Sequence, residues 1–367
     1  MKTTLRGLAQ IAGSFFIVCL PLSSGFAQSQ KATSVVSPSV FQTGHEMIHR
    51  ILTPSLHWID NERLLFLGMK AGRGPRPDVR KLYLWDMSNR SVKLYAEATS
   101  VCVVDGIVRY PISKDKEGGR MVVSEGPPGS EKVKEETLPS KEERDREPLV
   151  DSTFTCGSHL RSKLVPPSQP YRHIVVLKKG DGYLDIEPGG GPNLLEERRA
   201  PRRNLTLYQA SGKAIELPLT WDEQFSKFDV AYSNYKQAYV LRPRAPRGTP
   251  IGISGPWPKG KPLRAYLLWA DGRIETVFIP YSIVENLTSP RPTVVGWVFG
   301  GGRRPATVGL YLFDGKLTTK LDSGWAQEIS VSPDGCKAAA GIQEEPFESG
   351  ANPVNVKIFD FCAESRR

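Results

Sequence analysis

The chain has 367 residues, of which 39% are hydrophobic and 24% are charged, and its formal net charge at pH 7 is +10. A hydrophobic fraction of this size supports a packed core and excludes a chain that is disordered throughout. After the N-terminus no apolar run reaches the length of about 18 residues that a membrane-spanning helix needs, which excludes a polytopic membrane protein.

The N-terminus has the pattern of a secretory signal peptide over residues 1–27. Two basic residues precede an apolar stretch at 11–20, and small residues lead up to Ala27. We therefore expect cleavage after Ala27, export to the periplasm or the extracellular space, and no transmembrane segment in the mature chain. A retained membrane anchor is the alternative, disfavoured because the apolar stretch is short. Lipidation at Cys19 is disfavoured because the preceding residues are large.

Two patterns of strand residues recur along the rest of the chain. The first is a strand, an Asp/Asn/Gly turn and a second strand, found at residues 56–67, 101–110, 230–241 and 329–340. The second is an alternating strand that ends in an aromatic residue before a polar turn, found at 82–86, 205–208, 265–269, 310–314 and 356–360. Together they predict a repeating unit of four antiparallel strands, which we name A, B, C and D in chain order.

The spacing of the units predicts how many there are. The aromatic ends of the C strands fall at positions 85, 208, 269, 313 and 359, and the first interval is about twice the second. A further unit with a degenerate C strand at residues 120–124 fits between them. The sequence therefore predicts an all-β fold, a β-propeller of about six four-stranded blades, with an irregular β-sandwich as the alternative.

The last unit contains Ser332-Pro333-Asp334-Gly335, which resembles the repeat of TolB-type and WD-like bacterial β-propellers. The resemblance is clearest over residues 325–362 and 55–97, and it is at the level of the superfamily. It implies a ring-shaped binding scaffold, and it implies no single activity.

The last unit lacks a D strand because the chain ends near Cys362. Residues 45–52 precede the first A strand, and we expect them to fill this place, closing the ring with an N-terminal strand and removing an exposed sheet edge. This predicts one propeller domain over 45–367, after a flexible tail at 28–44. Residues 114–148 combine both signs of charge, and we expect a solvated loop excursion there.

Four cysteines follow the signal peptide, and an oxidising compartment would allow them to form disulfides. Cys336 begins the B strand of the last unit and Cys362 ends its C strand, so a disulfide between them is geometrically reasonable. The pairing of Cys102 and Cys156 stays open. No Cys-x-x-Cys motif is present, so a zinc ribbon or a thioredoxin-like site is unsupported.

Basic residues gather in the Gly- and Pro-rich segments between the predicted B and C strands. In an up-and-down unit the B–C and D–A connections lie on one side, so these segments predict a basic face that attracts anions. The residues that we expect to bind are Arg73, Arg76, Arg80, Arg202, Arg203, Arg244, Arg247, Arg303 and Arg304.

Arginine in these positions favours recognition of carboxylate or phosphate. For an exported protein this predicts an anionic envelope component or an acidic protein surface as the partner, and an exported binding scaffold as the function. The alternative is that the basic loops only keep the protein soluble. Nucleic acid is not expected, because the sequence has no recognition-helix motif and no regular pattern of stacking aromatics.

One motif favours a different function. His45-Glu46-Met47-Ile48-His49 matches His-Glu-x-x-His, which on a helix would place His45 and His49 on one zinc ion with Glu46 as general base. On a strand the two histidines would lie about 13 Å apart, too far for one metal. Ring closure therefore requires a strand at these residues, whereas a zinc site requires a helix. We expect the strand and no cofactor, and the alternatives are a zinc hydrolase or a propeller hydrolase with an unidentified central site.

Overall fold

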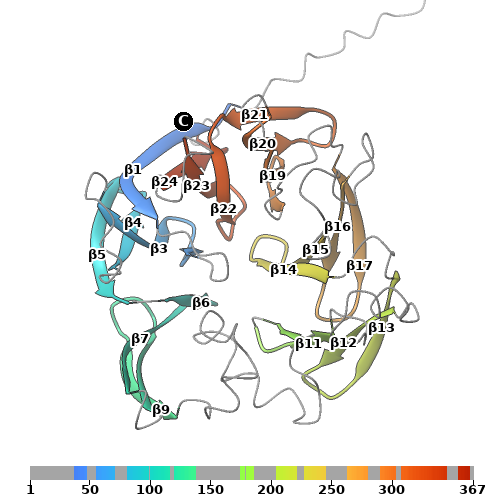
Figure 1. Cartoon of the computed structure of the whole chain (residues 1–367), viewed down its shortest axis with the longest axis horizontal. Coiled ribbons are helices and arrows are strands. Elements are labelled where there is room, and N and C mark those ends of the chain that lie inside the picture. Colours follow the sequence, from blue (N-terminus) through green and yellow to red (C-terminus); the bar gives the residue numbers. More distant parts are fainter. Residues whose placement is uncertain are drawn as a thin grey trace, which may run out of the picture. The chain divides into compact units, whose positions relative to one another are not determined.

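The computed structural model describes residues 37–47, 55–70, 81–98, 100–115, 120–137, 174–177, 179–185, 204–220, 227–244, 263–279, 290–302, 307–344 and 354–363. All of them lie in one compact unit, residues 36–367. Within these ranges the regular structure is entirely β-strand, and neighbouring strands pair antiparallel (Figure 1). The described ranges hold no helix that is long and apolar enough to cross a membrane.

Four sheets have four strands each, and in every one the strands follow one another in chain order. This is the up-and-down arrangement that the repeated strand–turn–strand patterns predict. The strands of the first two sheets are β6 (Cys102–Val104), β7 (Ile107–Asp115), β8 (Arg120–Gly126), β9 (Lys132–Thr137), β10 (Ile174–Val176), β11 (Gly182–Asp185), β12 (Asn204–Gln209) and β13 (Ala214–Thr220). Those of the next two are β14 (Lys227–Ser233), β15 (Ala238–Arg244), β16 (Leu263–Leu268), β17 (Ile274–Ile279), β18 (Arg291–Thr293), β19 (Gly296–Gly301), β20 (Gly309–Phe313) and β21 (Thr318–Asp322).

A fifth sheet has eight strands and joins the beginning of the described chain to its end. Its strands are β22 (Trp325–Val331), β23 (Lys337–Gln343), β24 (Val354–Asp360), β1 (Ser39–Met47), β2 (Leu56–Trp58), β3 (Arg63–Lys70), β4 (Lys81–Asp86) and β5 (Ser91–Glu97). Strand β1 pairs with β24 from Ser39↔Asp360 to Met47↔Val354, and its last three residues also pair with β3 (Figure 1).

The structure corrects the predicted position of this N-terminal strand. The strand that pairs with β24 is Ser39–Met47 and not 45–52, and residues 48–52 lie outside the described ranges. The segment expected as a flexible tail is therefore a strand from Ser39 onward. The physical reason is the pairing itself, since β24 pairs with β1 at residues 39–42 and again at 46 and 47.

The structure also corrects the predicted excursion at 114–148. Strands β8 and β9 occupy much of it, so the expected C strand at 120–124 is confirmed and the loop is wrong over β9. Charged residues are held in this sheet because Arg109 of β7 pairs with Glu125 of β8 and Glu136 of β9. Opposite charges on neighbouring strands stabilise a sheet. Residues 116–119 and 138–148 lie outside the described part.

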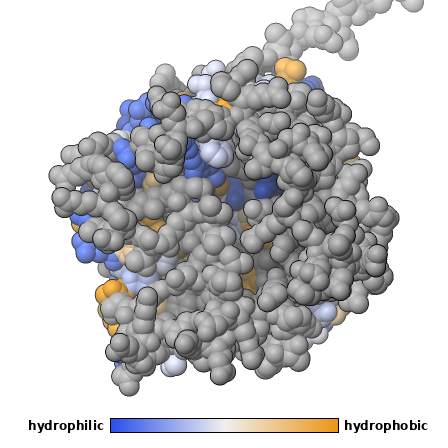
Figure 2. All heavy atoms as spheres, in the orientation of Figure 1, coloured by the Kyte–Doolittle hydropathy of each residue, from blue (hydrophilic) through white to orange (hydrophobic). Residues whose placement is uncertain are grey.

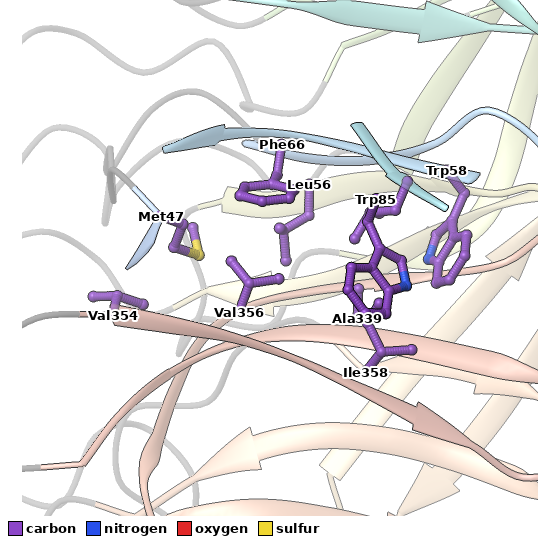
Figure 3. Packing of buried hydrophobic residues seen from close by; sticks show 10 residues of the cluster. Met47, Leu56, Trp58, Phe66, Trp85, Ala339, Val354, Val356 and Ile358 are labelled. Carbon is purple, nitrogen blue, oxygen red and sulfur yellow. The ribbon is translucent and has the colours of Figure 1, made fainter. Parts of the chain in front are cut away.

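Apolar side chains pack neighbouring groups of strands against one another. The cluster in Figure 3 joins β1–β4 to β23 and β24 and includes Trp58, Phe66, Trp85, Val356 and Ile358. Similar clusters pack the β2–β5 strands on β6–β7, the β10–β13 sheet on β14–β17, that sheet on β18–β21, and the latter on β22–β24. Fully burying one such large side chain contributes about 1.5–3 kcal/mol, so these clusters hold the sheets together.

Candidate functional site

The A–B turns of different four-stranded units contact one another. The N–H of Asp334, between β22 and β23, donates to the Asn61 Oδ1 between β2 and β3 at 2.9 Å. The carbonyl of Gly335 accepts from the N–H of Val294, in the β18–β19 turn, at 3.1 Å. Tyr235 of the β14–β15 turn also reaches Gly335, where a Cβ would lie 2.7 Å from its ring, and the φ of Gly335 is +75°. Glycine is therefore required at 335 both for its backbone and for the close approach of Tyr235.

The remaining A–B turns meet through a polar network. The Lys179 ammonium, in the β10–β11 turn, lies 2.9 Å from the Asp105 carboxylate of the β6–β7 turn and donates to Gln237 of the β14–β15 turn at 3.0 Å. The hydroxyl of Tyr239 donates to Asp181 at 2.6 Å, and burial together with this carboxylate raises the pKa of Tyr239. Within the described residues, each A–B turn thus contacts at least one other A–B turn.

The predicted basic segments leave from the opposite ends of the strands. They are the connections β3–β4, β11–β12, β15–β16 and β19–β20, which each join a second strand to a third. Antiparallel order sends these B–C connections away from the A–B turns. Of the nine predicted arginines only Arg244, the last residue of β15, is described, and its backbone pairs with Lys227. The others lie outside the described residues, so their joint binding role stays a prediction.

The described residues form a polar pocket of about 410 Å³ at these same strand ends. Asp322, Ser323 and Gly324 connect β21 to β22, Glu344 follows β23, and Lys357 lies on β24. The lining residues are Leu321, Asp322, Ser323, Gly324, Glu344 and Lys357. A D–A connection and a B–C connection thus contribute to one site.

A lysine between two carboxylates dominates this pocket. The Lys357 Nζ lies 2.9 Å from the Asp322 Oδ2 and 3.4 Å from the Glu344 Oε1. The side chains of Lys357 and Asp322 are 10% and 14% exposed, and that of Glu344 is 62% exposed. The N–H of Gly324 also donates to the Asp322 Oδ1 at 2.8 Å, so Asp322 is held by two donors. The three charged groups together carry one negative charge.

Sequence reasoning did not find this pocket. Of its charged residues, Lys357 falls in the expected strand at 356–360, and Asp322 and Glu344 belong to no motif. The available signal was Lys357 itself, a charged residue in the middle of the otherwise largely apolar strand β24. A lysine in such a place requires an acidic partner, and the sequence does not say which one.

The zinc motif does not form its helix. His45 and Glu46 lie on strand β1, and His49 is outside the described residues. The His45 Nδ1 lies 3.0 Å from the carbonyl oxygen of Thr43, and its ring packs edge-on against Tyr83 at 4.6 Å between centroids. Within the described ranges no group of three His, Cys, Asp or Glu residues is placed to hold a metal.

The predicted disulfide is present. Cys336 and Cys362 are bonded, with their Cα atoms 5.4 Å apart, and the N–H of Phe361 donates to the carbonyl of Cys336 at 2.9 Å. Cys102 also takes part in a disulfide, and its partner is not among the described residues. The bridge ties the C-terminal end of β24 to the A–B turn of the last sheet.

Large apolar side chains are exposed singly in the described part of the surface. On the face shown in Figure 2 the hydrophobic residues that carry a colour appear as small separate spots. The exposed ones come from four different sheets and are Val40, Leu94, Ile107, Ile112, Val133, Phe278, Val294 and Leu317. Scattered apolar residues of this kind are normal for a protein surface and do not indicate a hydrophobic docking site.

Among known proteins, only solved structures resemble this chain, and they do so in structure rather than in sequence. No protein-family model matches the chain, and no curated protein matches its sequence. The β-propeller domain of the Trilobed protease from Pyrococcus furiosus is 11% identical, with 82% of this chain and 84% of that chain covered and a TM-score of 0.31. The β-propeller domain of Cps50 from Myceliophteria thermophila is 10% identical, with 86% and 99% covered and a TM-score of 0.33.

An acylaminoacyl peptidase from Pyrococcus horikoshii is 12% identical, with 77% of this chain covered and a TM-score of 0.34, and this chain spans 40% of its length. Likenesses at these TM-scores say nothing of its activity.

Proposed function

We propose that this chain is an exported six-bladed β-propeller that binds an anionic envelope component through its B–C end. Counting the eight-stranded sheet as two blades gives six, with β1 as the D strand of the last. Its pairing with β24 supports closure of the ring by an N-terminal strand. The signal-like residues 1–27 support export to the periplasm or the extracellular space.

The single observation behind the binding function is the placement of the basic segments. The A–B turns contact one another, whereas the arginine-rich segments occupy B–C connections of several sheets. If the sheets form one ring, these connections gather on one face. Such a face would attract anions and speed their association, and the attraction would weaken with salt.

A charge-reversal experiment on the mature chain tests this function. One variant changes Arg202, Arg203, Arg303 and Arg304 to Glu, and the matched control changes Lys93, Lys213, Lys236 and Lys316 to Glu. The four lysines are exposed, and three of them lie in A–B or C–D turns. Each variant replaces four basic residues with glutamate, so the two variants have the same net charge. Binding to oligogalacturonate and to polyphosphate is measured at low and physiological salt.

We expect the arginine variant to bind both anions at least tenfold more weakly, with the control close to wild type and both variants folded. If the two variants weaken anion binding equally, the effect comes from net charge alone, and the proposal of a specific basic face is overturned.

A further inference from the structure

The pocket of Asp322, Glu344 and Lys357 has a chemistry that differs from that of the basic segments. Its volume of about 410 Å³ lies within the range of small-molecule sites. Sites of that class are mostly apolar, whereas Leu321 is the one apolar residue in this lining. The pocket therefore suits a group that forms many hydrogen bonds, and it does not suit an acyl chain or an aromatic ring.

The charges of the pocket exclude two further kinds of occupant. A bare phosphate or carboxylate would meet two carboxylates and one ammonium, a net repulsion. A bare cation would meet the Lys357 ammonium, which lies between both acids. A hydroxyl group avoids both conflicts, since it donates to a carboxylate and accepts from an ammonium.

The two carboxylates differ in how firmly they are held. Asp322 accepts from Gly324 and Lys357, which fixes its orientation. Glu344 lies at the longer distance of 3.4 Å from Lys357, and its side chain is 62% exposed. Glu344 can therefore turn toward a ligand hydroxyl, while Asp322 and Lys357 form a fixed donor and acceptor pair at the base.

The pocket lies where β21 ends, β22 begins and β23 ends, because Asp322–Gly324 and Glu344 line it. We propose that this pocket receives a hydroxyl-bearing sugar unit of the anionic partner. The inference rests on the proposed function and narrows the anionic partner from any envelope component to a glycan.

The test compares two probes on the mature protein. Oligogalacturonate carries carboxylates and sugar hydroxyls, whereas polyphosphate is an anion without sugar hydroxyls. The variants are Glu344→Gln and Asp322→Asn, and the control is Glu275→Gln at an exposed position of β17. Each substitution removes one negative charge, so general electrostatics alone would strengthen the binding of both anions.

We expect each pocket variant to bind oligogalacturonate at least tenfold more weakly and polyphosphate no more weakly than wild type does. The control should bind both probes no more weakly than wild type does. Glu344 is exposed, so Glu344→Gln should fold like wild type. Unchanged or tighter oligogalacturonate binding by this variant would overturn the inference. The basic face would still stand if the arginine variant weakened both probes, and absence of binding of either probe to wild type would overturn both proposals.

Discussion

The carboxylate of Glu328, on β22, accepts hydrogen bonds from the backbone N–H of Ser55 at 2.8 and 2.9 Å. The N–H of Leu56, the first residue of β2, donates to the same carboxylate at 2.9 Å. Burial raises the pKa of Glu328 to about 7, although these donors and the charge of Arg291 favour its ionised form. One side chain thus joins a strand near the end of the chain to a strand near its beginning, in a state that depends on pH.

The first prediction concerns this pH dependence. The ordinary pKa of a glutamate carboxyl is 4.5, so between about pH 4.5 and pH 7 the folded state binds more protons than the unfolded state. The free energy of unfolding therefore falls as pH rises through this window, by up to about 3 kcal/mol from this group. Glu328→Gln is neutral at every pH, so urea denaturation should show the variant gaining stability relative to wild type across the window.

Glu275→Gln, at an exposed position, serves as the control and should follow the wild-type profile. A difference between Glu328→Gln and wild type that stays constant from about pH 4.5 to pH 8 would contradict the assignment.

The second prediction concerns the ion pair between Lys337 and Glu62. The side chain of Lys337 is fully buried, and its Nζ lies 3.0 Å from the Glu62 Oε1 and donates to the carbonyl of Asn61 at 2.7 Å. Lys337→Ala removes both interactions and leaves a cavity, so it should lower the free energy of unfolding by about 3 kcal/mol. Glu62→Gln keeps an acceptor oxygen and should cost about 1 kcal/mol.

Lys316→Ala, in an exposed turn, is the matched control for loss of a lysine. If Lys337→Ala and Lys316→Ala have the same free energy of unfolding in urea denaturation, the buried ion pair contributes nothing to stability.

The third prediction concerns the disulfide. Cys336 and Cys362 are 26 residues apart, and a bridge closing a loop of this length contributes about 3 kcal/mol. The double variant Cys336→Ser/Cys362→Ser should fold, because Phe361 still bonds to residue 336 through the backbone, and it should unfold at lower urea concentration. Peptide mapping without reductant provides the direct check, and a free thiol at Cys336 would disprove the pairing.

Features set by local chemistry could be predicted from the sequence. In the Ser332–Gly335 turn the Asp334 Oδ1 accepts from the Ser332 hydroxyl at 2.6 Å and from the N–H of Cys336 at 3.0 Å, which is ordinary turn chemistry. The bridge from Cys336 to Cys362 was visible for a similar reason, because the two cysteines flank adjacent antiparallel strands. Strand identity and turn positions follow from such short-range patterns.

Features that depend on contacts between distant residues could not be placed. The hydroxyl of Thr43 donates to the carbonyl of Val356 at 3.1 Å, and the two residues are 313 positions apart in the sequence. The sequence around Thr43 does not indicate this partner. The pocket has the same origin, since Lys357 and Asp322 come from different sheets and meet only on folding. The start of β1 and the pocket were therefore missed, while the all-β class and the four-stranded antiparallel units were predicted correctly.

The fourth prediction concerns strand β1, which pairs with both β24 and β3. Two shortened chains test its role, one that starts at residue 37 and keeps β1, and one that starts at residue 48 and lacks it. The second loses the backbone pairing to β24 and the buried side chain of Met47, which packs in the cluster with Val354 and Phe66. It also exposes an edge of β24 that invites association with other chains.

We expect the chain from residue 37 to unfold cooperatively, and the chain from residue 48 to lose this cooperativity and to associate. A synthetic peptide of residues 37–47 added in excess should restore the transition, because it supplies the same strand in trans and stabilises by mass action. Equal denaturation midpoints for the two shortened chains would show that β24 and β3 hold together without β1, and this would refute closure by an N-terminal strand.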